Sequence, residues 1–149
     1  MNTKSSTKSN IPLWIRGVVM VNALVFIDFG AAFLLFPAKL AGLLDIELTS
    51  ATALADVRAI YGGLALAVGA SFVAGLRREE WLAPSVFLVM ASSAGLALGR
   101  IYSIAVSGIP RSIILLFLVT EVASFAWALL AYRALERPER ERSRAYAGA

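Results

Sequence analysis

Four long apolar runs constrain this chain more than any other feature. They cover residues 13–36, 57–76, 81–106 and 112–132 of the 149. Each has about 20 residues or more, and an α-helix of that length spans the roughly 30 Å hydrocarbon core of a bilayer. A helix on the surface of a soluble domain shows a narrower apolar stripe instead. The runs therefore predict an all-α fold, a four-transmembrane-helix bundle.

Proline and polar residues mark the expected boundaries. We expect a polar N-terminal tail over 1–12, a transmembrane domain over 13–135 with helices at 13–36, 52–76, 81–107 and 111–135, and a charged C-terminal tail over 136–149. Pro37 ends the first helix, and Ser50 or a neighbouring threonine caps the second. Leucines at helical spacing in 38–47 indicate a helix lying on the membrane surface; an ordinary loop is the equal alternative.

Basic residues are distributed unevenly between the two predicted ends of the bundle. One end carries Lys4, Lys8, Arg16, Arg77, Arg78, Arg133, Arg137, Arg140, Arg142 and Arg144, and the other carries Lys39, Arg58, Arg100 and Arg111. Cytoplasmic loops carry the excess of Lys and Arg. We therefore expect a multi-pass protein of the bacterial inner membrane with both termini cytoplasmic. The net charge of +4 follows from this asymmetry and does not indicate nucleic-acid binding.

The sequence contains no cysteine and no histidine. Their absence excludes thiol nucleophiles, iron–sulfur clusters, Cys/His zinc sites and histidine-ligated haem. We expect no metal and no cofactor. Carboxylates, arginine, tyrosine and serine are the side chains left for any chemistry.

Small residues recur every four positions on the second and third predicted helices. The second carries Ala59, Gly63, Ala67, Ser71 and Gly75, and the third carries Ala91, Gly95, Gly99 and Ser103. In lipid, such ridges let two helix backbones approach closely. They predict that these two helices pack against each other. The alternative is that one ridge faces another protomer or a partner.

Four charged residues interrupt the apolar runs, one on each helix: Asp28, Arg58, Arg100 and Glu121. An unpaired charge at mid-bilayer costs about 2.5–3.5 kcal/mol on insertion scales. At about 1.5 Å per residue, all four fall in the outer half of the membrane. They predict a neutral cluster inside the bundle, in which Asp28 pairs with one arginine and Glu121 with the other.

Tyr61, Tyr102 and Ser103 could supply hydroxyl groups to this cluster. Three roles fit it. In the first, its role is structural and limited to fixing the register of the bundle. It could form a small pocket for a phosphate, a carboxylate or a lipid headgroup. It could also serve a membrane enzyme that acts on a lipid or isoprenoid with Glu121 or Asp28 as acid or base.

The primary hypothesis is a non-enzymatic membrane protein. It would be an accessory subunit, or a binder of a lipid-like or small anionic ligand. Its expected partners are membrane lipids and a larger membrane complex or further copies of itself, with no nucleic acid. A small transporter is disfavoured, because no discontinuous helices are evident.

Several short strings resemble those of a known family. They are "RAIYGG" at 58–63, "GR" at 99–100, "SGIP" at 107–110, and Glu121 in the last helix. Over about residues 13 to 135 they resemble an uncharacterised bacterial family of small four-helix membrane proteins, classed as a domain of unknown function. The resemblance implies an integral membrane four-helix fold and no particular activity. The layout is also loosely similar to DoxX-like proteins, whose motifs are absent.

Overall fold

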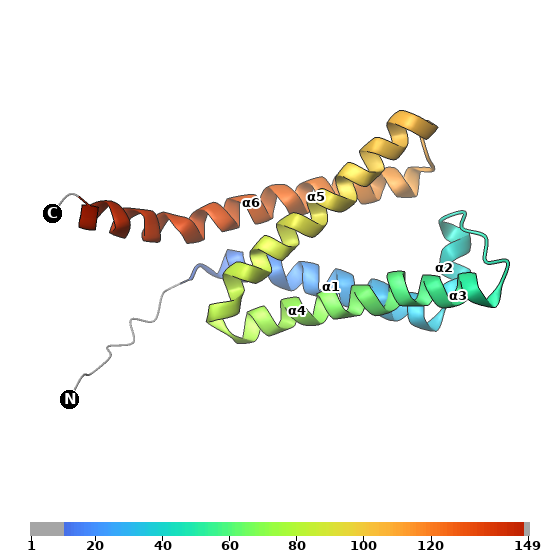
Figure 1. The fold of residues 1–149 in the computed structure, drawn as a ribbon, viewed down its shortest axis with the longest axis horizontal. Coiled ribbons are helices and arrows are strands. Elements are labelled where there is room, and N and C mark those ends of the chain that lie inside the picture. The colour runs from blue at the N-terminus through green and yellow to red at the C-terminus, as the bar shows by residue number, and fades with distance from the viewer. Residues whose placement is uncertain (1–10, 148–149) are drawn as a thin grey trace.

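The computed structural model describes the backbone of residues 11–147 and the side chains of residues 11–136. Within this range every regular element is a helix, which confirms the predicted all-α class (Figure 1). The elements, in chain order, are α1 (Leu13–Leu35), α2 (Pro37–Leu43), α3 (Ala51–Val57), the π-helix η1 (Arg58–Leu64), α4 (Ala65–Arg77), the 3₁₀-helix η2 (Glu79–Trp81), α5 (Leu82–Ser107) and α6 (Ser112–Ala147).

Four stretches of the described chain are long and apolar enough to cross a membrane. They are Leu13–Leu35, Ala51–Arg77, Glu79–Ser107 and Ser112–Glu136. The second is one continuous helix built from α3, η1 and α4. These helices make the chain a candidate four-span membrane protein, as its hydropathy predicts.

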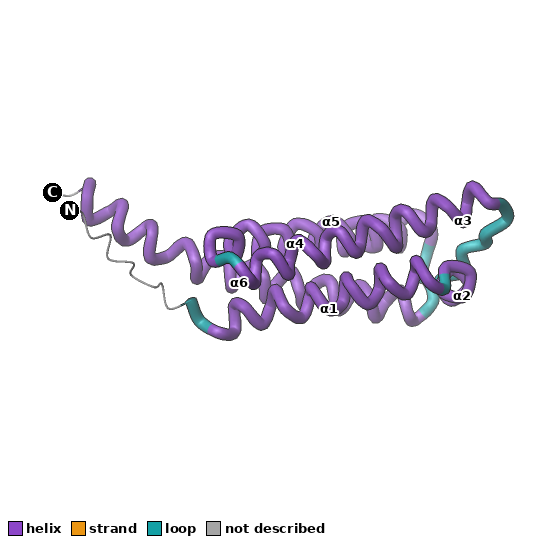
Figure 2. The backbone as a smooth tube through the Cα atoms, turned by 90° about the horizontal axis from the view of Figure 1, so that it is seen from below, coloured by secondary structure: helices purple, strands orange, loops and turns teal. Residues whose placement is uncertain are grey.

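The helices pair as two antiparallel hairpins. α1 lies along η1 and α4, and α5 lies along α6 (Figures 1 and 2). We call the end where α1 begins and α4 turns into α5 the inner end, and the end with α2, α3 and the α5–α6 turn the outer end. Toward the outer end the hairpins diverge (Figure 1).

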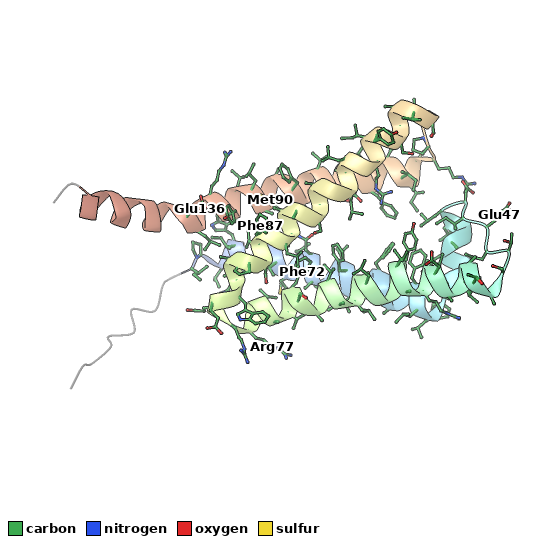
Figure 3. All side chains as sticks on the ribbon, in the orientation of Figure 1. Glu47, Phe72, Arg77, Phe87, Met90 and Glu136 are labelled. Atoms are coloured by element: carbon green, nitrogen blue, oxygen red, sulfur yellow. The ribbon has the colours of Figure 1, made fainter. Side chains whose placement is uncertain are left out.

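The two hairpins share one apolar core near the inner end. Its fully buried members are Ile15, Val18, Val19, Ala23, Phe72, Leu82, Val86, Val89, Ala128 and Ala131. Figure 3 places Phe72, Phe87 and Met90 around the point where α5 crosses α1. Arg16 adds a polar clamp at this end, because it donates to the carbonyl of Leu76 at 3.2 Å and to Glu79 at 3.0 Å. The apolar contact between the hairpins is therefore confined to the inner half.

Glycines hold α1 close to its partner helix. A Cβ built on Gly30 would lie 2.8 Å from both the Gly62 carbonyl oxygen and the Leu66 amide nitrogen. A Cβ on Gly62 would lie 2.7 Å from Leu34, and one on Gly69 would lie 2.7 Å from Ile27. Close backbone approach at small residues is the means by which helices associate in lipid. Here it joins the first and second spans.

The predicted packing of the second span on the third through small ridges is wrong for this structure. Ala59, Gly63, Ala67 and Ser71 are exposed. Gly95 and Gly99 on α5 have no neighbouring atom within 4 Å of a built Cβ. Contacts between α4 and α5 are few and lie near their shared turn, where Gly75 meets Ser85. The alternative, that the ridges face another protomer or a partner, stays a prediction.

The buried face of the second span lies beside the predicted ridge. Its positions are Gly62, Ala65, Gly69 and Phe72, which recur every three or four residues, as one face of an α-helix does. The predicted ridge repeats strictly every four residues and, from Ala59 to Ser71, falls on a neighbouring, exposed face. Each lies beside a member of the predicted ridge or within two residues of it.

The connections differ in detail from the predicted boundaries. The second span begins at Ala51, because the Ser50 hydroxyl caps it by accepting from the Ala53 amide at 3.1 Å. Residues 38–47 contain only the short helix α2, which ends at Leu43; Asp45 then adopts a positive φ of 57°. An exposed ion pair of 2.8 Å between Arg111 and Asp45 links the α5–α6 turn to this loop.

The last helix is longer than the sequence predicts. The expected end near residue 135 is replaced by a helix that continues to Ala147. Alanine, glutamate and arginine are strong helix formers, so the charged composition does not end it. Pro138 removes one backbone hydrogen bond without terminating the helix. The predicted N-terminal tail lies outside the described residues except for Ile11 and Pro12.

The bundle geometry gives the predicted orientation a direct test. Figure 3 shows Arg77 at the inner end and Glu47 at the outer end. We expect a membrane-impermeant maleimide to label Glu47→Cys in intact spheroplasts, and to label Arg78→Cys only after permeabilisation. The natural chain has no cysteine, so the background is clean. The reverse labelling pattern would refute the orientation with both termini cytoplasmic.

Candidate functional site

Arg100 and Glu121 form an ion pair between the two helices of the second hairpin. The Arg100 Nε–H donates to both carboxylate oxygens of Glu121, and each N···O distance is 2.9 Å. Arg100 continues the buried stripe of α5 formed by Val89, Ser93 and Ala97, since these positions recur every three or four residues. This is one of the two pairs that the sequence predicts.

The pair lies inside the predicted membrane span. At about 1.5 Å per residue, Arg100 is about 10 Å from the outer end of α5 at Ser107, and Glu121 is about 14 Å from the start of α6 at Ser112. The Arg100 side chain is 25% exposed and that of Glu121 12%. The guanidinium carbon lies 5.2 Å from the centroid of the Phe117 ring, which is a cation–π contact. Sequence reasoning did not identify Phe117, because an aromatic residue in an apolar run carries no distinguishing signal.

The far side of the Arg100 guanidinium has unused hydrogen-bonding capacity. Arginine has five N–H donors in a planar fork, and only Nε–H has an acceptor among the described side chains and backbone. No described side-chain nitrogen or oxygen is both buried and without a partner. The Nη1 and Nη2 groups are therefore reachable from outside the protein.

Asp28 does not join this pair, contrary to the predicted cluster. It is exposed, and among residues 11–136 it has no ion-pair partner. Residues three, four and seven positions away share its face of α1, and of these Val21, Leu24, Val25 and Leu35 are all exposed. The carboxylate thus lies on the side of α1 that faces away from the bundle.

Arg58 is also apart from the cluster. It begins the π-helix, is exposed, and has no ion pair within residues 11–136. Tyr61 points to α1 rather than to a charged group: its ring stacks on Phe33 with centroids 5.1 Å apart, and Phe29 lies 6.4 Å away. The motif "RAIYGG" therefore packs the first hairpin.

The two remaining predicted hydroxyls lie near the pair in sequence but on exposed surface. Tyr102 is 71% exposed, and Ser103, one helical turn beyond Arg100, is exposed as well. Neither forms a hydrogen bond with the described part of the chain. Of the seven predicted polar site residues, the structure joins only Arg100 and Glu121 directly.

This arrangement can hold an anion but is poorly suited to proton transfer. Both Glu121 oxygens accept from the same Arg100 N–H, so the carboxylate is already occupied by a protein partner. The exposed Nη groups offer parallel N–H donors of the kind that bind a carboxylate or phosphate in a bidentate manner.

Comparison with known proteins agrees with the resemblance noted in the sequence. Neither a curated protein nor a solved structure matches the chain. One family model matches residues 14–132, which cover the second and third spans, most of the first and the fourth, and both residues of the Arg100–Glu121 pair. The chain therefore belongs to the family described as a domain of unknown function, DUF4345.

Proposed function

We propose that this protein is a non-enzymatic, multi-pass protein of the bacterial inner membrane that binds an anionic group at Arg100 in the outer half of the bilayer. The observation that carries the proposal is that only one of the five N–H donors of the Arg100 guanidinium has an acceptor in the described protein. Glu121 holds its Nε–H, while Nη1 and Nη2 are accessible and have no acceptor within residues 11–136.

The ion pair sets both the strength and the selectivity of such a site. Glu121 fixes the guanidinium plane, so little side-chain entropy is lost when a ligand binds. Its negative charge also offsets the arginine, which removes most long-range attraction. Recognition then depends on short, charge-assisted hydrogen bonds, each contributing about 1.5–3 kcal/mol. An anion with two adjacent oxygens, such as a phosphate or carboxylate, fits this requirement.

The enzyme alternative receives less support from the geometry. Glu121 is committed to Arg100, and Asp28 lies on the opposite side of α1 from the bundle core. Neither carboxylate is therefore both free of a protein partner and directed into the bundle, as an acid or base acting there would be.

A second function, as the accessory subunit of a larger assembly, is favoured by the surface of α6. Only 6% of the apolar window in the span Ser112–Glu136 is buried, against 28–33% in the other three. Asp28 adds a charged group on an outward face. A neighbouring subunit would cover both features.

Native mass spectrometry of the detergent-extracted protein tests both functions. We expect phosphatidylglycerol to bind about tenfold more tightly than diacylglycerol of the same chain length, which lacks the phosphate, the equivalent of one charge-assisted hydrogen bond. The double variant Arg100→Gln/Glu121→Gln removes the charges together and should lose this preference.

Arg111→Gln is the matched control, because Arg111 lies at the exposed outer end of the bundle. It should keep the preference for phosphatidylglycerol. A double variant that also keeps it would refute the anion site. A stoichiometric polypeptide retained by wild type and both variants would instead support the accessory function.

A further inference from the structure

A shallow apolar groove adjoins the Arg100–Glu121 pair on the same two helices. It has a volume of about 190 Å³ and is lined by Ala94, Ala97, Leu98, Val122 and Phe125. Ala97 lies one turn before Arg100, and Val122 directly follows Glu121. Because α5 runs outward and α6 inward, the groove lies deeper in the membrane than the ion pair.

The groove is suited to a length of aliphatic chain. Ligand sites for whole small molecules usually measure about 300–1,000 Å³, so a compact ligand would not fit. All of its lining side chains are apolar, and a carboxylate or phosphate inside it would lose its hydrogen bonds to water without replacement. The alanines supply the open space, and Val122 and Phe125 form the wall on α6.

The order of these features matches an amphiphile in the outer leaflet. The backbone of Arg100 lies about 10 Å below the outer end of α5, and the apolar groove continues toward the bilayer centre. We propose that the anion bound at Arg100 is the phosphate of a membrane phospholipid whose acyl chain lies in this groove. The inference rests on the proposed anion site and names its ligand class.

The two parts of the site contribute differently. An acyl chain is in an apolar medium whether or not it enters the groove, so its transfer gives no hydrophobic gain. Its contribution is close packing against Leu98 and Phe125, made of many small dispersion contacts. The guanidinium then selects the headgroup, and the groove orients the lipid and slows its release.

The groove is tested by filling it. Ala94→Phe places a ring in the groove, and Ala91→Phe makes the same change at an exposed position on α5 that does not line it. In native mass spectrometry, Ala94→Phe should lower phosphatidylglycerol binding at least severalfold, and Ala91→Phe should leave it unchanged. Equal binding by the two variants would overturn the groove assignment.

A measurement on the wild-type protein covers the case in which Ala94→Phe fails to fold. Phosphatidylglycerol with a diazirine in one acyl chain should crosslink mainly within residues 94–98 and 122–125. Adducts spread evenly over all four spans would overturn the inference. If Arg100→Gln/Glu121→Gln loses headgroup preference while adducts are spread, only the groove assignment fails. If that double variant keeps the preference, the anion site itself fails.

Discussion

Gly30→Ala is expected to destabilise the protein by about 2–3 kcal/mol, the cost of forcing atoms into a packed interface. The new methyl carbon would lie 2.8 Å from two backbone atoms of the second span, the Gly62 carbonyl oxygen and the Leu66 amide nitrogen. Backbone cannot move aside as a side chain can, so the helices must separate. A clear drop in the free energy of unfolding, measured by sodium dodecyl sulfate titration with circular dichroism, is the expected result.

Gly99→Ala is the matched control for this prediction. It adds the same methyl group within a helix, but no atom lies within 4 Å of it. Because alanine has the higher helix propensity, we expect no loss of stability and a gain of up to about 1 kcal/mol. If Gly99→Ala were as damaging as Gly30→Ala, the third span would pack through its small ridge after all, either on the second span or on another copy.

Glu121→Gln should lower the free energy of unfolding by about 3 kcal/mol. This is the low end of the range for breaking a buried ion pair, because the Arg100 side chain remains partly accessible. The loss arises from an arginine left without its counter-charge in an apolar medium, rather than from the removed carboxylate itself. Thermal unfolding in detergent measures the effect.

Two further variants separate this cause from a general packing defect. Arg100→Gln combined with Glu121→Gln should recover much of the stability, since no unpaired charge remains. Asp45→Asn breaks an ion pair whose side chains are both 62% exposed, and it should cost less than about 1 kcal/mol. A double variant no more stable than Glu121→Gln would show that the charge balance is not the cause.

The four spans were predictable because mean hydropathy is averaged over about 20 residues, so no single residue decides the result. The signals for turns were equally local: Pro37 and Ser50 end or begin helices by their own backbone chemistry. The extension of α6 to Ala147 was missed, because a charged composition indicates solvation and says little about whether the backbone is helical.

The pairing of the helices was not predictable from the same data. In a membrane helix that is apolar all round, the sequence pattern gives little information on which face meets a neighbour. Small residues occupy both the buried and the exposed face of the second span, so small size alone does not identify the packing face. A ridge counted at regular intervals therefore selected Gly63, which is exposed, over Gly62, which is buried.

The depth of each charged residue in the membrane was predictable from the sequence. The direction in which its side chain faces was not. Counting residues placed Arg100 and Glu121 at similar levels on neighbouring spans, and these two meet. The same counting placed Asp28 in the outer half, but the rotation of α1 turns it away from the bundle. With two acidic and two basic residues, one on each helix, the net charge of the four is zero. That balance does not determine which of the charged side chains face one another.

The hairpin architecture has a consequence for how the protein is made. The close contacts around Gly30, Gly62 and Gly69 lie within the first 77 residues, so the interface of the first hairpin needs no residue of α5 or α6. Membrane insertion can then proceed as two successive helix pairs, each leaving the translocon already associated. Arg100 would enter the translocon ahead of Glu121, and the second hairpin would become charge-neutral only when α6 follows.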